Sequence, residues 1–430
     1  MTVNPPARFS SMRIKGTPFI DLMVKSLFIS VTLMSALQTL PFAFLFIPFS
    51  VAVFLRPGSK SSHRVPFSIY EPVIAVYMLS ETVNCCISRY SANSVTPLLK
   101  SLSLILFYRL IRSTFGAKMT NWVLCAFYGL GLYLSIVTCV VFTLHLTRLK
   151  LYGFDNPAHF KNLFEPLGAL NNEWATLFLL FLPFPVSLYL RYHEKRGAWL
   201  FLSGLLPLTC AIFFSFSRGL YIALFLFLLL VCVQYSIFAI CPPGELLATL
   251  ILYLGLTGLL VFPVKKALIT TCAGFETTSQ IRSYKGRMTI WKNSFAMIRK
   301  YPVLGVGAGN YALYYSVWQS DRDDAVFSGQ PFSTYIQILA EKGAVGFLCF
   351  MGICTLFLLR SIKRIKNEGS ISKRGVILIF LSAVLAVLVR DMSYSTLLRQ
   401  DGVHLLFWFM FAYNTRTTPA NGNQSAGKTR

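Results

Sequence analysis

The chain has 430 residues, of which 55% are hydrophobic, 15% aromatic and only 13% charged. Apolar runs of about 17 to 25 residues recur along it, which is the length a helix needs to cross a bilayer. This pattern excludes a soluble two-domain protein and predicts an all-α polytopic membrane protein. The formal net charge is +24, but the basic residues lie mostly in short loops between apolar runs. That distribution indicates membrane orientation and anionic lipid headgroups, and it argues against a nucleic-acid partner.

Hydropathy divides the chain into five parts. We expect a cytoplasmic tail over residues 1–19, a transmembrane bundle of about nine spans over 20–264 and a loop domain over 265–332. About three more spans follow over 333–415, and a cytoplasmic tail covers 416–430. The predicted spans, about twelve in all, are 20–36, 38–55, 67–88, 98–114, 122–145, 170–190, 198–216, 219–240, 245–264, 333–359, 375–390 and 402–415.

Charge places these parts relative to the membrane. Short basic loops at 56–64, 191–196 and 360–374 fall on one side under this count, together with both termini, so that side is the cytoplasm. The loop at 265–332 then lies outside, in the periplasm of a Gram-negative cell. Long loops translocate largely regardless of their charge. A basic exported loop on a membrane bundle therefore predicts an anionic, lipid-attached ligand.

Arg218 is the sharpest single candidate. It lies in the tight Ser215–Gly219 turn between two apolar helices. This turn is expected at the boundary between the membrane and water on its outer, non-cytoplasmic side. A guanidinium there can bind phosphate oxygens bidentately and stays charged at physiological pH. The alternative is an arginine that anchors a helix end by snorkelling.

Arg287 is a second candidate, at the start of a predicted short amphipathic helix. Met288, Trp291, Phe295 and Ile298 make an apolar stripe at helical spacing, and Lys292 lies off it. The alternative is an interfacial helix whose basic residues face lipid headgroups.

Further polar candidates follow in the chain. Gly305, Gly307, Gly309 and Asn310 form a turn that could present backbone N–H groups to an anion, although such a turn is more often a helix stop. Gln337 and Glu341 are four residues apart at the start of the tenth span, where acidic groups are costly and often functional. For Arg390 and Asp391, the simplest interpretation is a local ion pair. The cysteines have no metal-ligand spacing.

These residues together resemble a known family. Phe216-Ser217-Arg218-Gly219, then Gly286-Arg287 with Ile290-Trp291, then Pro302-x-Leu304-Gly305-Val306-Gly307-x-Gly309-Asn310, then Tyr335-x-Gln337-x-Leu339-x-Glu341-x-Gly343 occur in that order. The set resembles the O-antigen ligase and O-antigen polymerase superfamily of membrane glycan transferases. Asn171-Asn172 and Arg390-Asp391 also fit its pattern.

The resemblance implies a metal-independent glycosyltransferase without a cofactor, in lipopolysaccharide biosynthesis at the bacterial inner membrane. Its donor would be a glycan on undecaprenyl pyrophosphate, and its acceptor lipid A–core or a growing glycan, on the periplasmic face. Arg218 and Arg287 match the arginines that bind the donor pyrophosphate. We take Arg218, Arg287 and Glu341 as catalytic candidates. The substrate-binding candidates are Lys292, Gly305, Gly307, Gly309, Asn310, Gln337, Asn172 and Arg390.

One position departs from the family pattern. Where the family has a histidine, taken as the base for the acceptor hydroxyl, this chain has Phe332, followed by Ser333. Either another group acts as base, or none is needed, because a base contributes only about 10²–10⁴-fold. The candidate bases are Glu341, Asp321, Asp323, Asp324 and His159.

Three functions stay open at this stage. A ligase would move a finished glycan onto lipid A–core, and a polymerase would join repeat units on the same carrier. The third is a transporter of lipid-linked sugars. The sequence argues against it, because it lacks the repeated halves that many transporters have.

Overall fold

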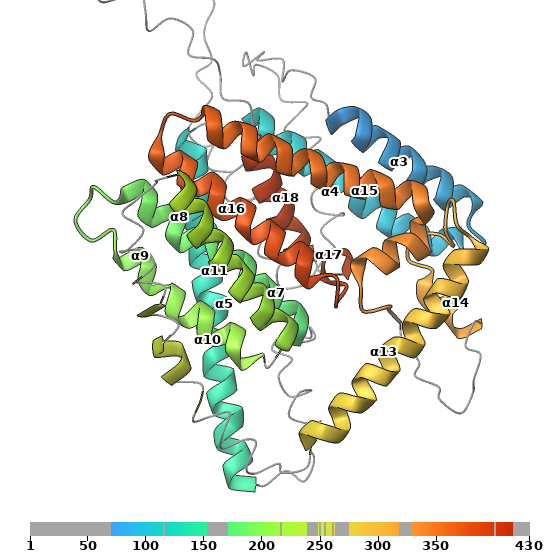
Figure 1. Ribbon diagram of the computed structural model, residues 1–430, viewed down its shortest axis with the longest axis horizontal. Coiled ribbons are helices and arrows are strands. Elements are labelled where there is room, and N and C mark those ends of the chain that lie inside the picture. The colour runs from blue at the N-terminus through green and yellow to red at the C-terminus, as the bar shows by residue number, and fades with distance from the viewer. Residues whose placement is uncertain are drawn as a thin grey trace, which may run out of the picture.

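The computed structural model describes residues 70–114, 117–152, 171–215, 217–238, 248, 251–252, 255–259, 262, 275–317, 329–399 and 401–415. Within these ranges the protein consists of α-helices and turns, without a strand (Figure 1). The predicted spans 20–36 and 38–55, both predicted tails and most of the predicted span 245–264 lie outside the described residues. The all-α fold class is confirmed for the part that is described.

The helices follow the predicted order of apolar runs. They are α3 (Tyr70–Ile87), α4 (Ser91–Thr114), α5 (Ala117–Tyr152), α7 (Asn171–Phe181), α8 (Pro183–Tyr192), α9 (Leu200–Ser203), α10 (Leu205–Phe214), α11 (Arg218–Phe238), α13 (Phe275–Lys300), α14 (Tyr311–Val317), α15 (Thr334–Asn367), α16 (Ile371–Arg390), α17 (Thr396–Arg399) and α18 (Asp401–Thr415).

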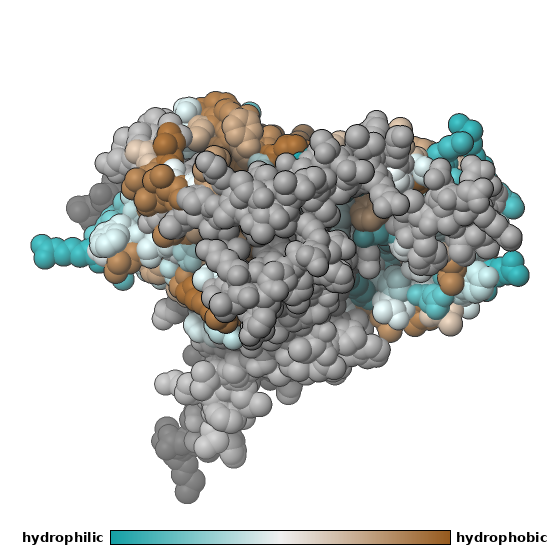
Figure 2. Space-filling view, turned by 90° about the horizontal axis from the view of Figure 1, so that it is seen from below, coloured by the Kyte–Doolittle hydropathy of each residue, from teal (hydrophilic) through white to brown (hydrophobic). Residues whose placement is uncertain are grey.

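Five helical segments among the described residues are long and apolar enough to cross a membrane. They are Asn121–Leu144, Ala175–Tyr192, Arg218–Phe238, Thr334–Asn367 and Ile371–Arg390. Figure 2 shows hydrophobic side chains over much of the described surface, with hydrophilic ones gathered toward the two ends of the long axis. These features indicate a multi-pass membrane protein, while the total of about twelve spans stays a prediction.

The centre of the bundle is the segment made by α7 and α8. In this span 83% of residues are buried, against 33% in α11, where Ile222, Phe225 and Ile237 are exposed. A helix that is apolar all round and buried on all sides belongs in a core, whereas α11 has one face left for lipid. Pro183 begins α8, where its missing N–H costs no intrahelical bond. The second central helix, α16, packs against α8, α11 and α18.

Helix α13 differs from the sequence prediction in where it begins. It begins at Phe275, so Arg287 lies near its middle and not at its start. No proline interrupts the preceding residues, and Gly286 costs only about 1 kcal/mol within a helix. Of the predicted apolar stripe, Met288 and Phe295 are exposed, while Trp291 and Ile298 are partly buried. The fully buried face is Ile290, Asn293, Ser294 and Met297.

Small polar groups explain which face of α13 is buried. The Ser294 hydroxyl lies 2.6 Å from that of Tyr311, and Asn293 Nδ2 donates to Tyr315 Oη at 3.5 Å. These bonds attach α13 to α14, and Ile290, Met297, Val306 and Ala340 pack around them. The face that forms these hydrogen bonds is therefore the buried one, although the opposite face has large apolar side chains. The exposed Met288 and Phe295 on that opposite face are consistent with a helix at the membrane interface.

Helix α15 is broken at Gly343, whose φ is 64°. The chain segment 302–307 bonds to the broken part from both sides. Ala344 N donates to Pro302 O at 2.8 Å and Val345 N to Val303 O at 3.3 Å, while Val306 N donates to Ala340 O at 2.9 Å. Because an unpaired backbone group is costly away from water, this segment is what allows the break.

We expect Gly343→Ala to destabilise the protein. A Cβ at this position would overlap the Val303 carbonyl, and the positive φ disfavours any other residue. Strain alone costs about 1–3 kcal/mol, so thermal unfolding in detergent should begin at a clearly lower temperature. Gly369→Ala is the matched control, because a Cβ there meets nothing within 4 Å. Equal midpoints for the two variants would contradict the role of the break.

Candidate functional site

Two of the predicted arginines come from helices that meet at one turn, residues 390–396, which we call the Ser393 turn. Arg287 Nη1 donates to the carbonyl oxygen of Ser393 at 3.4 Å. A Cβ on Gly219 would lie 3.1 Å from Ser393 Oγ, so the start of α11 touches the same residue. Arg218 is the first residue of α11, and its side chain is exposed. Arg287 and the start of α11 are far apart in the chain, and both thus approach the turn that follows α16.

Arg287 is half-buried against aromatic rings. Its guanidinium carbon lies 5.3 Å from the centroid of the Phe332 ring. Burial lowers the pKa of Arg287, and the nearby Tyr394 hydroxyl acts in the opposite direction. An arginine keeps its charge in proteins despite such a shift. The side chain is therefore a fixed cation that is partly shielded from water, which makes its field stronger than that of a surface charge.

Phe332 is held in an uncommon backbone conformation. Its φ is 51°, and among the described residues it is the non-glycine residue with positive φ. Its ring lies 5.7 Å from that of Tyr394 at 53°, and the preceding carbonyl, of Pro331, accepts a bond from Trp291 Nε1 at 2.8 Å. Such strain costs about 1–3 kcal/mol and collects at functional sites. The structure thus fixes an aromatic ring beside Arg287.

Arg390 lies on the buried side of the same turn. Its guanidinium carbon is 4.8 Å from the Tyr394 ring centroid, and Nη1 is 3.8 Å from Asp391 Oδ1. The predicted local ion pair is present, with both side chains almost fully buried. Lys292, five residues after Arg287 on α13, is exposed.

The predicted glycine turn, residues 304–310, is packed against α15 and α3. Gly305, Gly307 and Gly309 all have positive φ, as a turn of this shape requires. The N–H groups of Gly305 and Gly307 donate to the carbonyl oxygens of Tyr301 and Glu341, at 3.2 and 3.0 Å. Asn310 is buried and donates to Ser88 Oγ at 2.6 Å. These donors are bound within the chain, so a substrate-binding role for the turn stays a prediction.

Glu341 lies under this turn. Gln337 Nε2 donates to its Oε1 at 3.2 Å, so the expected four-residue spacing places the two side chains in contact. The backbone N–H groups of Gly309 and Tyr311 also bond to its carboxylate. With these donors Glu341 holds the turn and the start of α14, and its action as a base stays a prediction.

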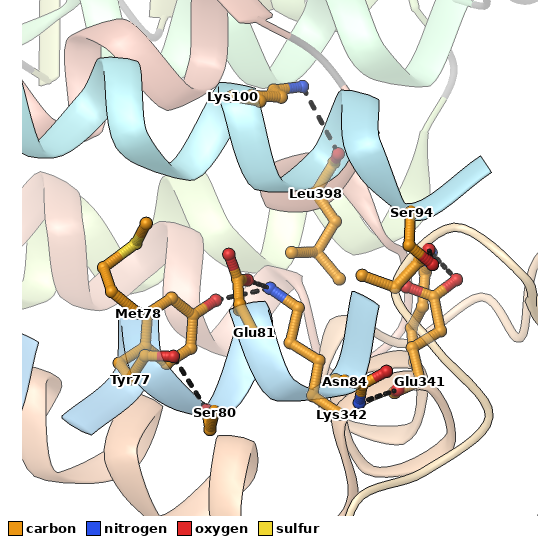
Figure 3. Close-up of polar contacts among 12 residues, drawn as sticks. Tyr77, Met78, Ser80, Glu81, Asn84, Ser94, Lys100, Glu341, Lys342 and Leu398 are labelled. Carbon is orange, nitrogen blue, oxygen red and sulfur yellow. Dashed lines mark hydrogen bonds and ion pairs between the residues drawn. The ribbon is translucent and has the colours of Figure 1, made fainter. Parts of the chain in front are cut away.

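Sequence reasoning missed the polar contacts that α3 makes with α15. Lys342 forms a buried ion pair with Glu81 and reaches the ring of Tyr77 (Figure 3). Asn84 Nδ2 donates to Glu341 O at 3.0 Å and also to Leu304 O. The available signal was Glu81 within the apolar run 67–88, because a charge at membrane depth requires a partner.

A cavity of about 50 Å³ lies between α3, α4, α15, α17 and α18. Its lining is mainly apolar, with Lys342 and His404 among the polar residues. His404 lies here and not at the Ser393 turn.

Several predicted site residues lie outside the described part of the structure. Asn172 falls within α7, but its side chain lies outside the described part, as do the candidate bases Asp321, Asp323, Asp324 and His159. No group of three or more metal-ligating side chains occurs among the residues that are described.

The family model described as O-antigen ligase matches residues 203–351. The match includes Arg218, Arg287, the glycine turn and Glu341, and it covers about a third of the chain. It confirms the resemblance to the O-antigen ligase superfamily, and with the apolar helices it indicates a membrane protein of ligase or polymerase type. A comparison with curated proteins gave no match.

The pair Glu81–Lys342 yields a stability prediction. Lys342→Met leaves the Glu81 charge buried without its partner, and breaking one side of such a pair costs about 3–5 kcal/mol. The double variant Glu81→Leu with Lys342→Met removes both charges and should recover most of the loss. Thermal unfolding in detergent compares the two. If the double variant is less stable than the single, the ion-pair account is wrong.

Proposed function

We propose that this protein transfers a glycan from undecaprenyl pyrophosphate to a membrane-bound acceptor, on the periplasmic face of the inner membrane. The acceptor we propose is lipid A–core, which makes the protein an O-antigen ligase in lipopolysaccharide biosynthesis. The observation that carries the proposal is the meeting of Arg287 and the start of α11 at Ser393. The family match supports it, because it covers both elements.

The two arginines would act on the leaving group. An acceptor hydroxyl oxygen attacks the anomeric carbon as the bond from that carbon to the pyrophosphate oxygen breaks, with inversion. The electron pair of the breaking bond moves onto the diphosphate, and the hydroxyl proton is lost to a base or to water. Guanidiniums of Arg218 and Arg287 would neutralise the growing negative charge, so the reaction needs no metal ion. Charge that is fixed in place beforehand stabilises this transition state better than mobile water does.

In the described structure the residue beside Arg287 at the position of the family histidine is Phe332, which cannot accept a proton from the acceptor hydroxyl. We propose that transfer relies mainly on the good leaving group. A missing base costs about 10²–10⁴-fold at most, which is less than the total acceleration that such enzymes typically reach. If a base acts, its candidates are Glu341, Asp321, Asp323, Asp324 and His159.

The remaining candidate residues surround this centre. Lys292, five residues after Arg287 on α13, would add positive charge near the donor. Arg390 lies on the buried side of the Ser393 turn. Its positive charge would add to the electrostatic potential that favours the leaving diphosphate. We propose that Asn172, Gln337, Gly305, Gly307, Gly309 and Asn310 shape the surrounding binding site.

We expect Arg287→Ala and Arg218→Ala each to lower transfer by about 10²–10³-fold, as loss of one transition-state donor typically does. Arg299→Ala is the matched control, because Arg299 is exposed on the same helix as Arg287. The measurement is the lipopolysaccharide ladder of a deletion strain that carries each variant at equal membrane level. A normal ladder with both active-site variants would overturn the proposal.

The same assay separates the two branches of the family. In a deletion strain, finished polymer that remains on the carrier identifies a ligase. A single repeat unit on the core identifies a polymerase. A ladder that does not change on deletion contradicts both branches for lipopolysaccharide.

A further inference from the structure

The Ser393 turn is organised by one buried carboxylate. Asp391 has no exposed surface. Its Oδ2 accepts hydrogen bonds from Thr334 Oγ1 at 2.6 Å and from Leu397 N at 2.8 Å. Its Oδ1 accepts a bond from the Thr396 hydroxyl. Three donors, one from α15 and two from α17, therefore converge on this side chain.

Backbone bonds attach the same turn to the start of α15. Thr334 N donates to the carbonyl oxygens of Asp391 and Tyr394, at 3.0 and 3.3 Å. Ser393 N donates back to Arg390 O at 3.0 Å, which continues the end of α16 into the turn. The conformation of residues 391–394 is thus fixed at both ends.

What the turn presents depends on that conformation. The Ser393 carbonyl is the acceptor for Arg287, and the Tyr394 ring lies against Phe332 and Arg390. The catalytic candidate and its aromatic neighbours therefore contact the outer side of a loop whose inner side is held by Asp391. Burial raises the pKa of Asp391, and Arg390 with the surrounding donors acts in the opposite direction.

We propose that Asp391 is a positioning residue for Arg287. It acts through the Ser393 turn, with Thr334 as its main side-chain donor, and does not touch substrate itself. This inference rests on the proposed function, because the group it positions is the one assigned to the leaving diphosphate. A shift of about 1 Å in such a group is enough to cost about 100-fold in rate.

Thr334→Val tests this without leaving a new charge, because it removes the hydroxyl and keeps the shape. Transfer assayed with purified protein and lipid-linked donor should show kcat lowered by about 10- to 100-fold, with the donor KM changed little. Thr334→Ser keeps the hydroxyl and should remain within about threefold of wild type. Thr415→Val, which removes another buried hydroxyl far along α18, is the matched control and should retain its rate.

A double-mutant cycle shows whether the effect passes through Arg287. Combined with Arg287→Lys, Thr334→Val should cost much less than the product of the two single losses, because both disturb one interaction. Fully multiplicative losses, or a Thr334→Val rate equal to wild type, would overturn the inference. An equal loss with Thr415→Val would reduce it to general instability.

An assay without transfer separates this inference from the proposed function. Phenylglyoxal reacts with accessible arginines, and peptide mass spectrometry measures its addition at Arg287. We expect the modification rate of Arg287 to rise several-fold in Thr334→Val and to stay unchanged in Thr334→Ser. An unchanged rate in both overturns the positioning role. A raised rate in a protein that shows no transferase activity would keep the positioning role and reject the function.

Discussion

Backbone hydrogen bonding around the break in α15 is the constraint on which the rest of the site depends. A spanning helix satisfies its own N–H and C=O groups, and a break exposes several of them at a depth where water is scarce. Here the segment 302–307 supplies the missing partners, so the glycine turn must lie against Glu341 and Gly343. That requirement fixes where α13 ends and where α14 begins. The orientation of α13, and with it the place of Arg287, follows from this backbone exchange.

The site combines two kinds of polar contact with different purposes. Glu81–Lys342, Gln337–Glu341 and Asp391 are buried and bond to other groups inside the protein, so they hold helices in register. Arg218 and Lys292 are exposed, and Arg287 is half-buried. Buried charges that are fully paired are costly to disturb, whereas open cations are available to a ligand. Burial and pairing thus distinguish the residues that hold the structure from those that could bind a ligand.

The sequence predicted correctly those features that depend on local composition alone. Long apolar runs predicted the helices from α3 to α11 and from α15 to α18, and the Ser215–Gly219 turn placed Arg218 at a helix start. It was wrong on the start of α13, which begins at Phe275 and not at Arg287. It did not predict which face of α13 is buried, because Ser294 and Asn293 bond to α14 and no periodicity reveals such partners. The ion pair of Glu81 with Lys342 joins residues 261 positions apart, and Thr334 with Asp391 joins residues 57 apart. Neither pairing follows from composition or spacing, because only the folded chain brings these residues together.

The contacts of α3 and α4 with the glycine turn bear on how this domain can be inherited. Ser88, Ser94 and Asn84 bond to the carbonyls of Val306, Ala308 and Leu304. All three donors lie before residue 203, where the family match begins. A gene fragment that encoded the matched region alone would thus lack the partners that its central turn requires. Recombination between distant relatives should therefore succeed only where the early helices are exchanged together with the turn they hold.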